Sequence, residues 1–166
     1  MHILINNKNL IYYNYKVKCA LGKRGIKNKR NEGDKITPKG LYKIKYILYR
    51  KDRIKKIQTN LKKIIIKKDM GWCDDSKSKK YNKLVQLPFK YSYERLYRKD
   101  SSYDIILVLN YNMNPVIKEK GSAIFIHVAK KNYKKTKGCI AVKKFELLKI
   151  VKKIKSNTRV KILGQK

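Results

Sequence analysis

Short stretches in which apolar and polar residues alternate recur along most of the chain. Residues 10–17 (LIYYNYKV) and 41–49 (LYKIKYILY) are rich in Tyr and Ile and alternate in part, which predicts strands with one buried face. Residues 61–66 (LKKIII) and 159–163 (RVKIL) predict two further short strands. Residues 105–109 (IILVL) are apolar on both faces, as in the central strand of a core. The pattern is that of a β-rich protein.

One segment near the C-terminus has helical spacing instead. Residues 143–156 (KKFELLKIVKKIKS) place four apolar side chains on one face with lysines opposite: Leu147, Leu148, Val151 and Ile154. No alternation of strands with helices repeats along the chain. The predicted fold is therefore mainly β, with one C-terminal helix.

Two polar segments predict long loops. Residues 22–40 (GKRGIKNKRNEGDKITPKG) contain four glycines and a proline among charged residues. Residues 69–82 (DMGWCDDSKSKKYN) carry Gly, Asp and Ser around Trp72, the only tryptophan. Long loops inside a compact domain are often functional.

Composition limits the choice of class. The 166 residues suit one domain spanning residues 1–166, and 42% hydrophobic residues suffice for a packed core. The formal charge of +34 would attract any polyanion. However, the lysines are spread over almost every segment, and the sequence has no aromatic and basic arrangement typical of a nucleic-acid-binding domain. We therefore expect no specific nucleic-acid partner. Residues 1–13 (MHILINNKNLIYY) lack the continuous apolar stretch of a signal peptide, and no stretch is long enough for a membrane span.

A histidine and a cysteine lie close together near the C-terminal third of the chain. Within the predicted strand 122–128, His127 shares a face with Ala123 and Phe125, and Cys139 follows twelve positions later, directly after Gly138. A hairpin-like connection would bring the two side chains together. A nearby imidazole can deprotonate a thiol for attack on an acyl carbon. From spacing alone, a core histidine and a buried thiol remain the alternative.

The other two cysteines leave several possibilities open. Cys19 and Cys73 would form a disulfide in an oxidising compartment if their loops adjoin, or remain buried thiols. A zinc site built from the three cysteines and His127 lacks the closely spaced ligand pairs that such sites use. We expect neither a metal nor a cofactor.

Residues 121–142 (GSAIFIHVAKKNYKKTKGCIAV) resemble the histidine and glycine-cysteine signature of the L,D-transpeptidase catalytic domain, the YkuD type, in its small single-domain branch. The likeness continues, in the family's order, through CALGKRGI, EGDKITPKGLYKI, DMGWCDDS, YNKLVQLPF, ERLY and YDIILVLNYN. It departs from the common signature at Lys137 and Ala141, where a histidine and an Arg or Asn are usual, and at Val128, where glycine is frequent.

The resemblance implies a sandwich-like β domain that acts on peptidoglycan stem peptides through a thioester. By position, Cys139 would be the nucleophile and His127 the general base, oriented by the Val128 carbonyl, while the amides of Gly138 and Cys139 would form the oxyanion hole. With an amine acceptor the product is a cross-link or an exchanged D-amino acid, and with water the enzyme is an L,D-carboxypeptidase. Five residues in the shared segments are candidates to line the cleft: Trp72, Asp74, Tyr103, Asn110 and Thr136.

The resemblance also implies a bacterial enzyme of the periplasm or cell envelope, which we expect to be a monomer. Because no signal peptide is visible, a cytoplasmic location stays open. Two other functional hypotheses remain: a non-catalytic basic module that binds an anionic polymer or nucleic acid, and a degenerate family member kept as a scaffold. Only the enzyme requires the Cys139 thiol.

Overall fold

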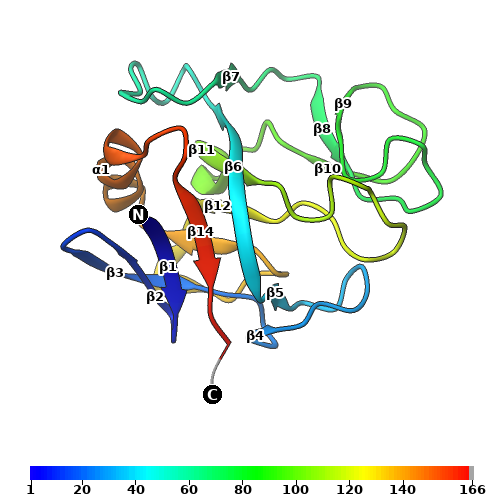
Figure 1. The fold of residues 1–166 in the computed structure, drawn as a ribbon. Helices are drawn as coiled ribbons and strands as arrows, with labels where there is room; N and C mark the ends of the chain where they lie inside the picture. Colours follow the sequence, from blue (N-terminus) through cyan, green and yellow to red (C-terminus); the bar gives the residue numbers. More distant parts are fainter. Residues whose placement is uncertain (165–166) are drawn as a thin grey trace.

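The computed structural model describes residues 1–164 and confirms a mainly β fold with one C-terminal helix (Figure 1). Helix α1 spans Lys144–Lys153, and two 3₁₀ turns, η1 and η2, span Ser101–Tyr103 and Lys131–Tyr133. The strands are β1 (His2–Asn6), β2 (Asn9–Tyr12), β3 (Tyr15–Ala20), β4 (Ile26–Lys27), β5 (Thr37–Pro38), β6 (Gly40–Tyr49), β7 (Lys63–Ile65), β8 (Met70–Cys73), β9 (Leu84–Gln86), β10 (Tyr93–Arg95), β11 (Ile105–Leu109), β12 (Phe125–Val128), β13 (Ile140–Val142) and β14 (Arg159–Ile162).

The main sheet closes on itself. Its strands follow the order β11-β12-β13-β3-β2-β1-β14-β6-β7, and β6 also pairs with β11 over Ile105 to Leu109. This pairing closes the circuit from β11 to β6, and β7 lies beside β6 as an added strand. The long strand β6 runs through the middle of the view in Figure 1, with β14 and β1 beside it. Closure leaves few unpaired strand edges, and it gives each strand an inner and an outer face.

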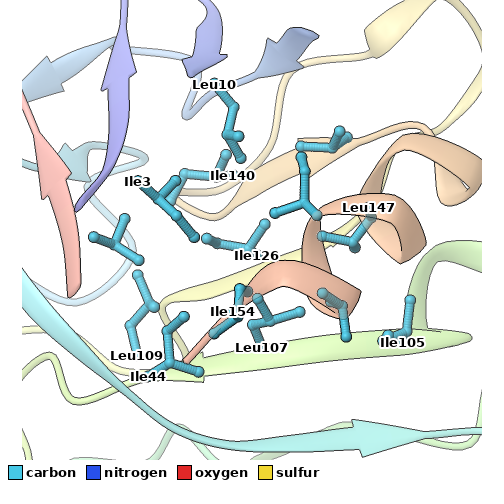
Figure 2. Close-up of a cluster of buried hydrophobic side chains, with 14 of the residues drawn as sticks. Ile3, Leu10, Ile44, Ile105, Leu107, Leu109, Ile126, Ile140, Leu147 and Ile154 are labelled. Carbon is cyan, nitrogen blue, oxygen red and sulfur yellow. The ribbon is translucent and has the colours of Figure 1, made fainter. Parts of the chain in front are cut away.

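The inner face holds the larger hydrophobic cluster, in which aliphatic side chains from the strands and from α1 converge (Figure 2). Ile126 of β12 and Ile140 of β13 point into it, and Leu147, Ile150 and Val151 of α1 pack against it. All five side chains are fully buried. Burying such a side chain contributes ~1.5–3 kcal/mol, so the inner cluster is the main source of stability.

The outer face of β11 and β12 carries a second, more aromatic cluster. Phe125 of β12, Trp72 of β8 and Tyr103 of η1 pack there, with the Trp72 and Phe125 rings edge to face at 5.1 Å. The three-stranded sheet β10-β8-β9 covers this cluster, on the side of the molecule away from α1 in Figure 1. The strand predicted for residues 122–128 is shorter than expected, because β12 begins at Phe125. Within β12 the predicted alternation is confirmed, because Phe125 and Ile126 enter different clusters.

Several local predictions were wrong. Residues 10–17 form parts of two strands, β2 and β3, which a turn at Tyr13 separates. Tyr13 adopts a φ of 54°, which is uncommon for a residue other than glycine, so the sequence did not indicate a turn there. The segment 69–82 is not all loop, because it begins with strand β8.

The helix prediction was right in position and slightly long. Helix α1 ends at Lys153, and Ile150 is fully buried while Leu148 is only half-buried. The segment 22–40 is irregular as predicted, apart from the short parallel pair β4 and β5. Within residues 1–164, no helix combines the length and the apolar character that crossing a membrane requires.

Candidate active site

Adjacent strands bring His127 and Cys139 into one cleft. Strands β12 and β13 pair in parallel, with His127 opposite Ala141, so Cys139 immediately precedes the strand that neighbours the histidine. Both residues line a cleft of about 880 Å³ on the outer side of the closed sheet. The connection is not a hairpin, because the chain passes through η2 and re-enters in the same direction. His127 and Cys139 thus line the same cleft, and the predicted hairpin route between them was wrong.

The imidazole of His127 is held in one orientation. Its Nδ1 lies 2.9 Å from the Val128 carbonyl oxygen, which can only accept, so Nδ1 carries the proton and Nε2 the lone pair. The Tyr103 ring lies edge-on against the imidazole, with ring centres 5.3 Å apart. Burial lowers the pKa of His127 to about 4, against the opposing effect of the bond to Val128. At neutral pH the ring is therefore an uncharged base.

The thiol of Cys139 is also neutral at rest. Burial, reinforced by the nearby Glu94 carboxylate, raises its pKa to about 12. Its Sγ lies 3.0 Å from the Ala123 carbonyl oxygen, to which the thiol donates. Because the thiolate is the nucleophilic form, an attack needs a proton acceptor at the moment of reaction.

The turn before Cys139 is tightly fixed. The Thr136 hydroxyl donates to the Cys139 carbonyl oxygen at 2.6 Å and accepts the Gly138 N–H at 3.1 Å. Gly138 has a φ of 144°, and a Cβ there would lie 2.9 Å from the Ile36 carbonyl oxygen in the segment 22–40. A glycine is therefore required for conformation and for space.

Charged groups surround the reactive pair. The Tyr103 hydroxyl donates to Glu94 Oε1 at 2.7 Å, and the Arg98 guanidinium lies 3.8 Å from the same oxygen. Burial raises the pKa of Glu94, whereas its bonds to Tyr103 and Arg98 act the other way. The rest of the lining is mostly basic, with Lys23, Lys29, Lys35, Lys130, Lys134, Lys135 and Lys137 against Glu32 and Asp74.

Three of the five residues predicted to line the cleft do so. Asp74, Tyr103 and Thr136 are at its surface. Trp72 is only 1% exposed and packs under the site, where its Nε1–H donates to Asn82. Asn110 lies apart from the cleft, and its side chain accepts from the backbone N–H of Lys43 in β6.

Sequence reasoning missed the side chains that surround the pair. Glu94 was visible only as part of the family-like string ERLY, and Asn82 only as the second residue of YNKLVQLPF. Both are polar residues among lysines, a context that ordinarily indicates a solvated surface. The chain has 11 acidic residues against 45 basic ones. Because an acidic residue is uncommon in such a sequence, its presence was the one signal that could have marked Glu94.

The other cysteines take no part in the site. All three cysteines are within the described residues and carry free thiols, so Cys19 and Cys73 do not pair. Cys19 lies in β3 within the inner cluster, and Cys73 lies in β8. Among residues 1–164, no three His, Cys, Asp or Glu side chains gather as a metal site would need.

The fold and the cleft define a mainly β domain with a cysteine and an oriented, uncharged histidine at one pocket. A family model, the YkuD L,D-transpeptidase catalytic domain, matches residues 1–162. The chain therefore belongs to the YkuD family of L,D-transpeptidase catalytic domains, a family that works on peptidoglycan. A search of the curated proteins found no match to this chain.

Proposed function

We propose that this protein is an active L,D-transpeptidase in which Cys139 attacks a peptidoglycan stem peptide. The observation that carries the proposal is the bond between His127 Nδ1 and the Val128 carbonyl, which assigns Nε2 as the unprotonated nitrogen of a ring that lines the same cleft as Cys139. The family assignment supports the reaction class.

Acylation begins with transfer of the Cys139 thiol proton to Nε2 of His127. The sulfur then forms a bond to the carbonyl carbon of the third residue of the stem, and that carbonyl oxygen becomes an oxyanion. When the tetrahedral intermediate collapses, the C–N bond to the terminal D-alanine breaks and His127 returns its proton to the leaving amine. The product is a thioester on Cys139.

The oxyanion is stabilised in this proposal by the backbone amides at Gly138 and Cys139. In the resting structure the Gly138 N–H donates to the Thr136 hydroxyl. That hydroxyl also donates to the Cys139 carbonyl, so it can keep the turn in place while the Gly138 N–H is shared with the oxyanion. Thr136 thus supports the oxyanion site.

Deacylation reverses the same steps with another nucleophile. An acceptor amine attacks the thioester carbonyl and gives its proton to His127. The C–S bond then breaks, and His127 passes that proton to the departing sulfur, which restores the thiol of Cys139 and the neutral imidazole. Water in place of the amine gives L,D-carboxypeptidase activity.

Stem peptides carry carboxylates, and the lysines around the cleft attract these negative charges. We place this reaction in the periplasm or cell envelope, and a fusion to a compartment-dependent reporter tests that location.

The first experiment is intact-protein mass spectrometry after incubation with a stem tetrapeptide and, separately, with a carbapenem. The wild type should gain the mass of one acyl group, and Cys139→Ala should gain none. Cys73→Ala is the matched control, because it also removes a free thiol but at a residue outside the lining of the cleft. His127→Gln should fold and acylate at least ~100-fold more slowly.

Two results would contradict the proposal. One is an adduct that persists in Cys139→Ala, because another residue would then be the nucleophile. The other is the absence of any adduct in folded wild-type protein with both ligands. In that second case a degenerate scaffold or a basic binding module would explain the chain better.

A further inference from the structure

Asn82 is a buried polar hub beneath the candidate active site. Its side chain belongs to a residue only 2% exposed, and all of its strong hydrogen-bonding positions are used. Its Nδ2 donates to the backbone carbonyls of Tyr111 and Asn112, at 2.9 and 2.7 Å. Its Oδ1 accepts from Trp72 Nε1 at 3.1 Å and from the Ala123 N–H at 3.0 Å. A network so completely paired fixes the groups it joins.

The last of these contacts leads directly to the nucleophile. Ala123 has a φ of 52°, a left-handed conformation that costs energy for a residue with a Cβ and persists only where its surroundings hold it. Asn82 supplies such a restraint at the Ala123 N–H. The carbonyl of the same Ala123 accepts the Cys139 thiol at 3.0 Å.

We propose that Asn82 is a positioning residue for Cys139, which it controls by fixing the Ala123 carbonyl that accepts the resting thiol. Asn82 itself touches neither the sulfur nor the substrate. This inference deepens the proposed function and rests on it for the identity of the nucleophile.

The arrangement keeps the resting enzyme poised but unreactive. A thiol that donates to a carbonyl is stabilised in its neutral form, which acts in the same direction as burial on the pKa of Cys139. For catalysis the S–H must leave Ala123 for Nε2 of His127, and the bound substrate replaces the lost contact. Other titratable groups also face the thiol, namely Glu94 of β10, Lys29 of the segment 22–40, Tyr103 of η1 and His127 of β12.

The test measures the alkylation of Cys139 by iodoacetamide between pH 6 and 11, with peptide mapping by mass spectrometry to separate the three cysteines. In Asn82→Ala, the Ala123 carbonyl is no longer fixed and the neutral thiol loses stabilisation. Alkylation at pH 8 should become about three- to tenfold faster, and the curve of rate against pH should shift to lower pH. Acylation by the carbapenem should slow by ~10-fold or more, because the sulfur is no longer held in the orientation needed for attack.

Trp72→Phe is the matched control. It removes another donor to the same Asn82 Oδ1, and it leaves the bond to Ala123 in place. Its alkylation curve should coincide with that of the wild type, even if its melting temperature falls. All four titratable neighbours of Cys139 are retained in both variants.

Asn82→Asp provides a second test if Asn82→Ala does not fold. It loses the two donations to the Tyr111 and Asn112 carbonyls but keeps an acceptor for the Ala123 N–H. The Ala123 carbonyl therefore stays restrained, and alkylation at pH 8 should be no faster than in the wild type. Folded Asn82→Ala with an unchanged alkylation curve would overturn the proposal, as would faster alkylation in Asn82→Asp. Alkylation needs no stem peptide, so a failure of the proposed function would appear separately, as a lack of acyl adducts in the wild type.

Discussion

At the scale of single residues, the site combines two groups that are both uncharged at rest. His127 is kept neutral by burial, and Cys139 is kept neutral by burial and by Glu94. A preformed thiolate and imidazolium pair is therefore not the resting state. In the proposed mechanism the proton moves only when an acyl carbon is present to receive the sulfur, which would restrict reaction to bound substrate.

Burial of His127 makes stability depend on pH. Its pKa is about 4 in the folded protein, against an ordinary value of 6.5 for an exposed histidine, so the unfolded chain binds the proton more readily. The free energy of unfolding should fall as pH drops from 6.5 to 4, by on the order of 3 kcal/mol, and should not change further from this cause below pH 4. Urea unfolding at several pH values measures this slope.

His127→Gln isolates the contribution of the histidine. Glu94 acts in the opposite direction, because its raised pKa favours the folded state as pH falls, but it is present in both proteins. The variant should therefore lose less stability than the wild type between pH 6.5 and 4. Equal slopes would mean that the imidazole is not buried in neutral form.

The residue scale also shows what the sequence could reveal about the site. Alternation along residues 122–128 and the resemblance around Gly138 and Cys139 were enough to select His127 and Cys139, which line one cleft in the structure. They could not reveal the Ala123 carbonyl or Asn82, because these contacts join residues 16 and 41 positions apart. Such contacts depend on the packing of distant strands, which leaves no local pattern.

At the scale of elements, the segment 22–40 supports the turn that carries Cys139. Gly22 forms an isolated bridge with Thr136, and the Lys23 N–H donates to the Thr136 carbonyl at 3.0 Å. The Thr136 N–H in turn donates to the Leu21 carbonyl at 2.9 Å. A long, lysine-rich loop is thus held against the nucleophile by backbone bonds that do not depend on its side chains.

Gly138→Ala tests this contact between elements. The added Cβ would meet the Ile36 carbonyl at 2.9 Å and the residue would be strained at a φ of 144°. Unfolding free energy should fall by about 2–4 kcal/mol, and acylation should fall at least ~10-fold. Gly25→Ala is the control, because its φ of 75° is also unfavourable but nothing lies within 4 Å of the new Cβ. It should cost about 1 kcal/mol and leave acylation unchanged, and similar acylation losses in both variants would contradict the supporting role.

Elements were predicted unevenly for physical reasons. The apolar run 105–109 and the amphipathic helix carry their signal within one segment, and both were found. The hairpin of β2 and β3 turns at Tyr13 without a glycine or proline, and β8 contains Gly71, whose bare backbone lies against the Tyr93 ring. The turn therefore lacks the usual Gly or Pro signal, and the strand contains a glycine, which usually counts against a strand.

At the scale of the whole molecule, the two ends of the chain close the sheet. Strand β1 pairs in parallel with β14, and Ile3 lies opposite Val160 with both side chains fully buried. These strands connect the β2 and β3 hairpin to β6, so their pairing completes the circuit. Stability should depend on this junction, although neither strand contributes a residue to the lining of the cleft.

Ile3→Ala should destabilise the protein by about 2–5 kcal/mol, because it leaves a cavity in the inner cluster. Chemical denaturation monitored by circular dichroism measures the change. Leu41→Ala serves as a comparison, because Leu41 is 47% exposed and its truncation should cost less than about 1 kcal/mol. At a temperature where Ile3→Ala is folded, its acylation rate should match that of the wild type. A slower rate would show that the junction and the cleft are coupled.

Because the sheet is closed, the two faces of a single strand are subject to different evolutionary constraints. Along β12, Ile126 faces the inner cluster whereas Phe125 packs under the cleft that His127 lines. Exchange among Ile, Val and Leu on the inner side is tolerated when volume is kept. The inner side can therefore exchange one aliphatic residue for another while the outer side keeps the residues that line the cleft. Among the buried residues, relatives of this chain should therefore differ more within the inner cluster than in the lining of the cleft.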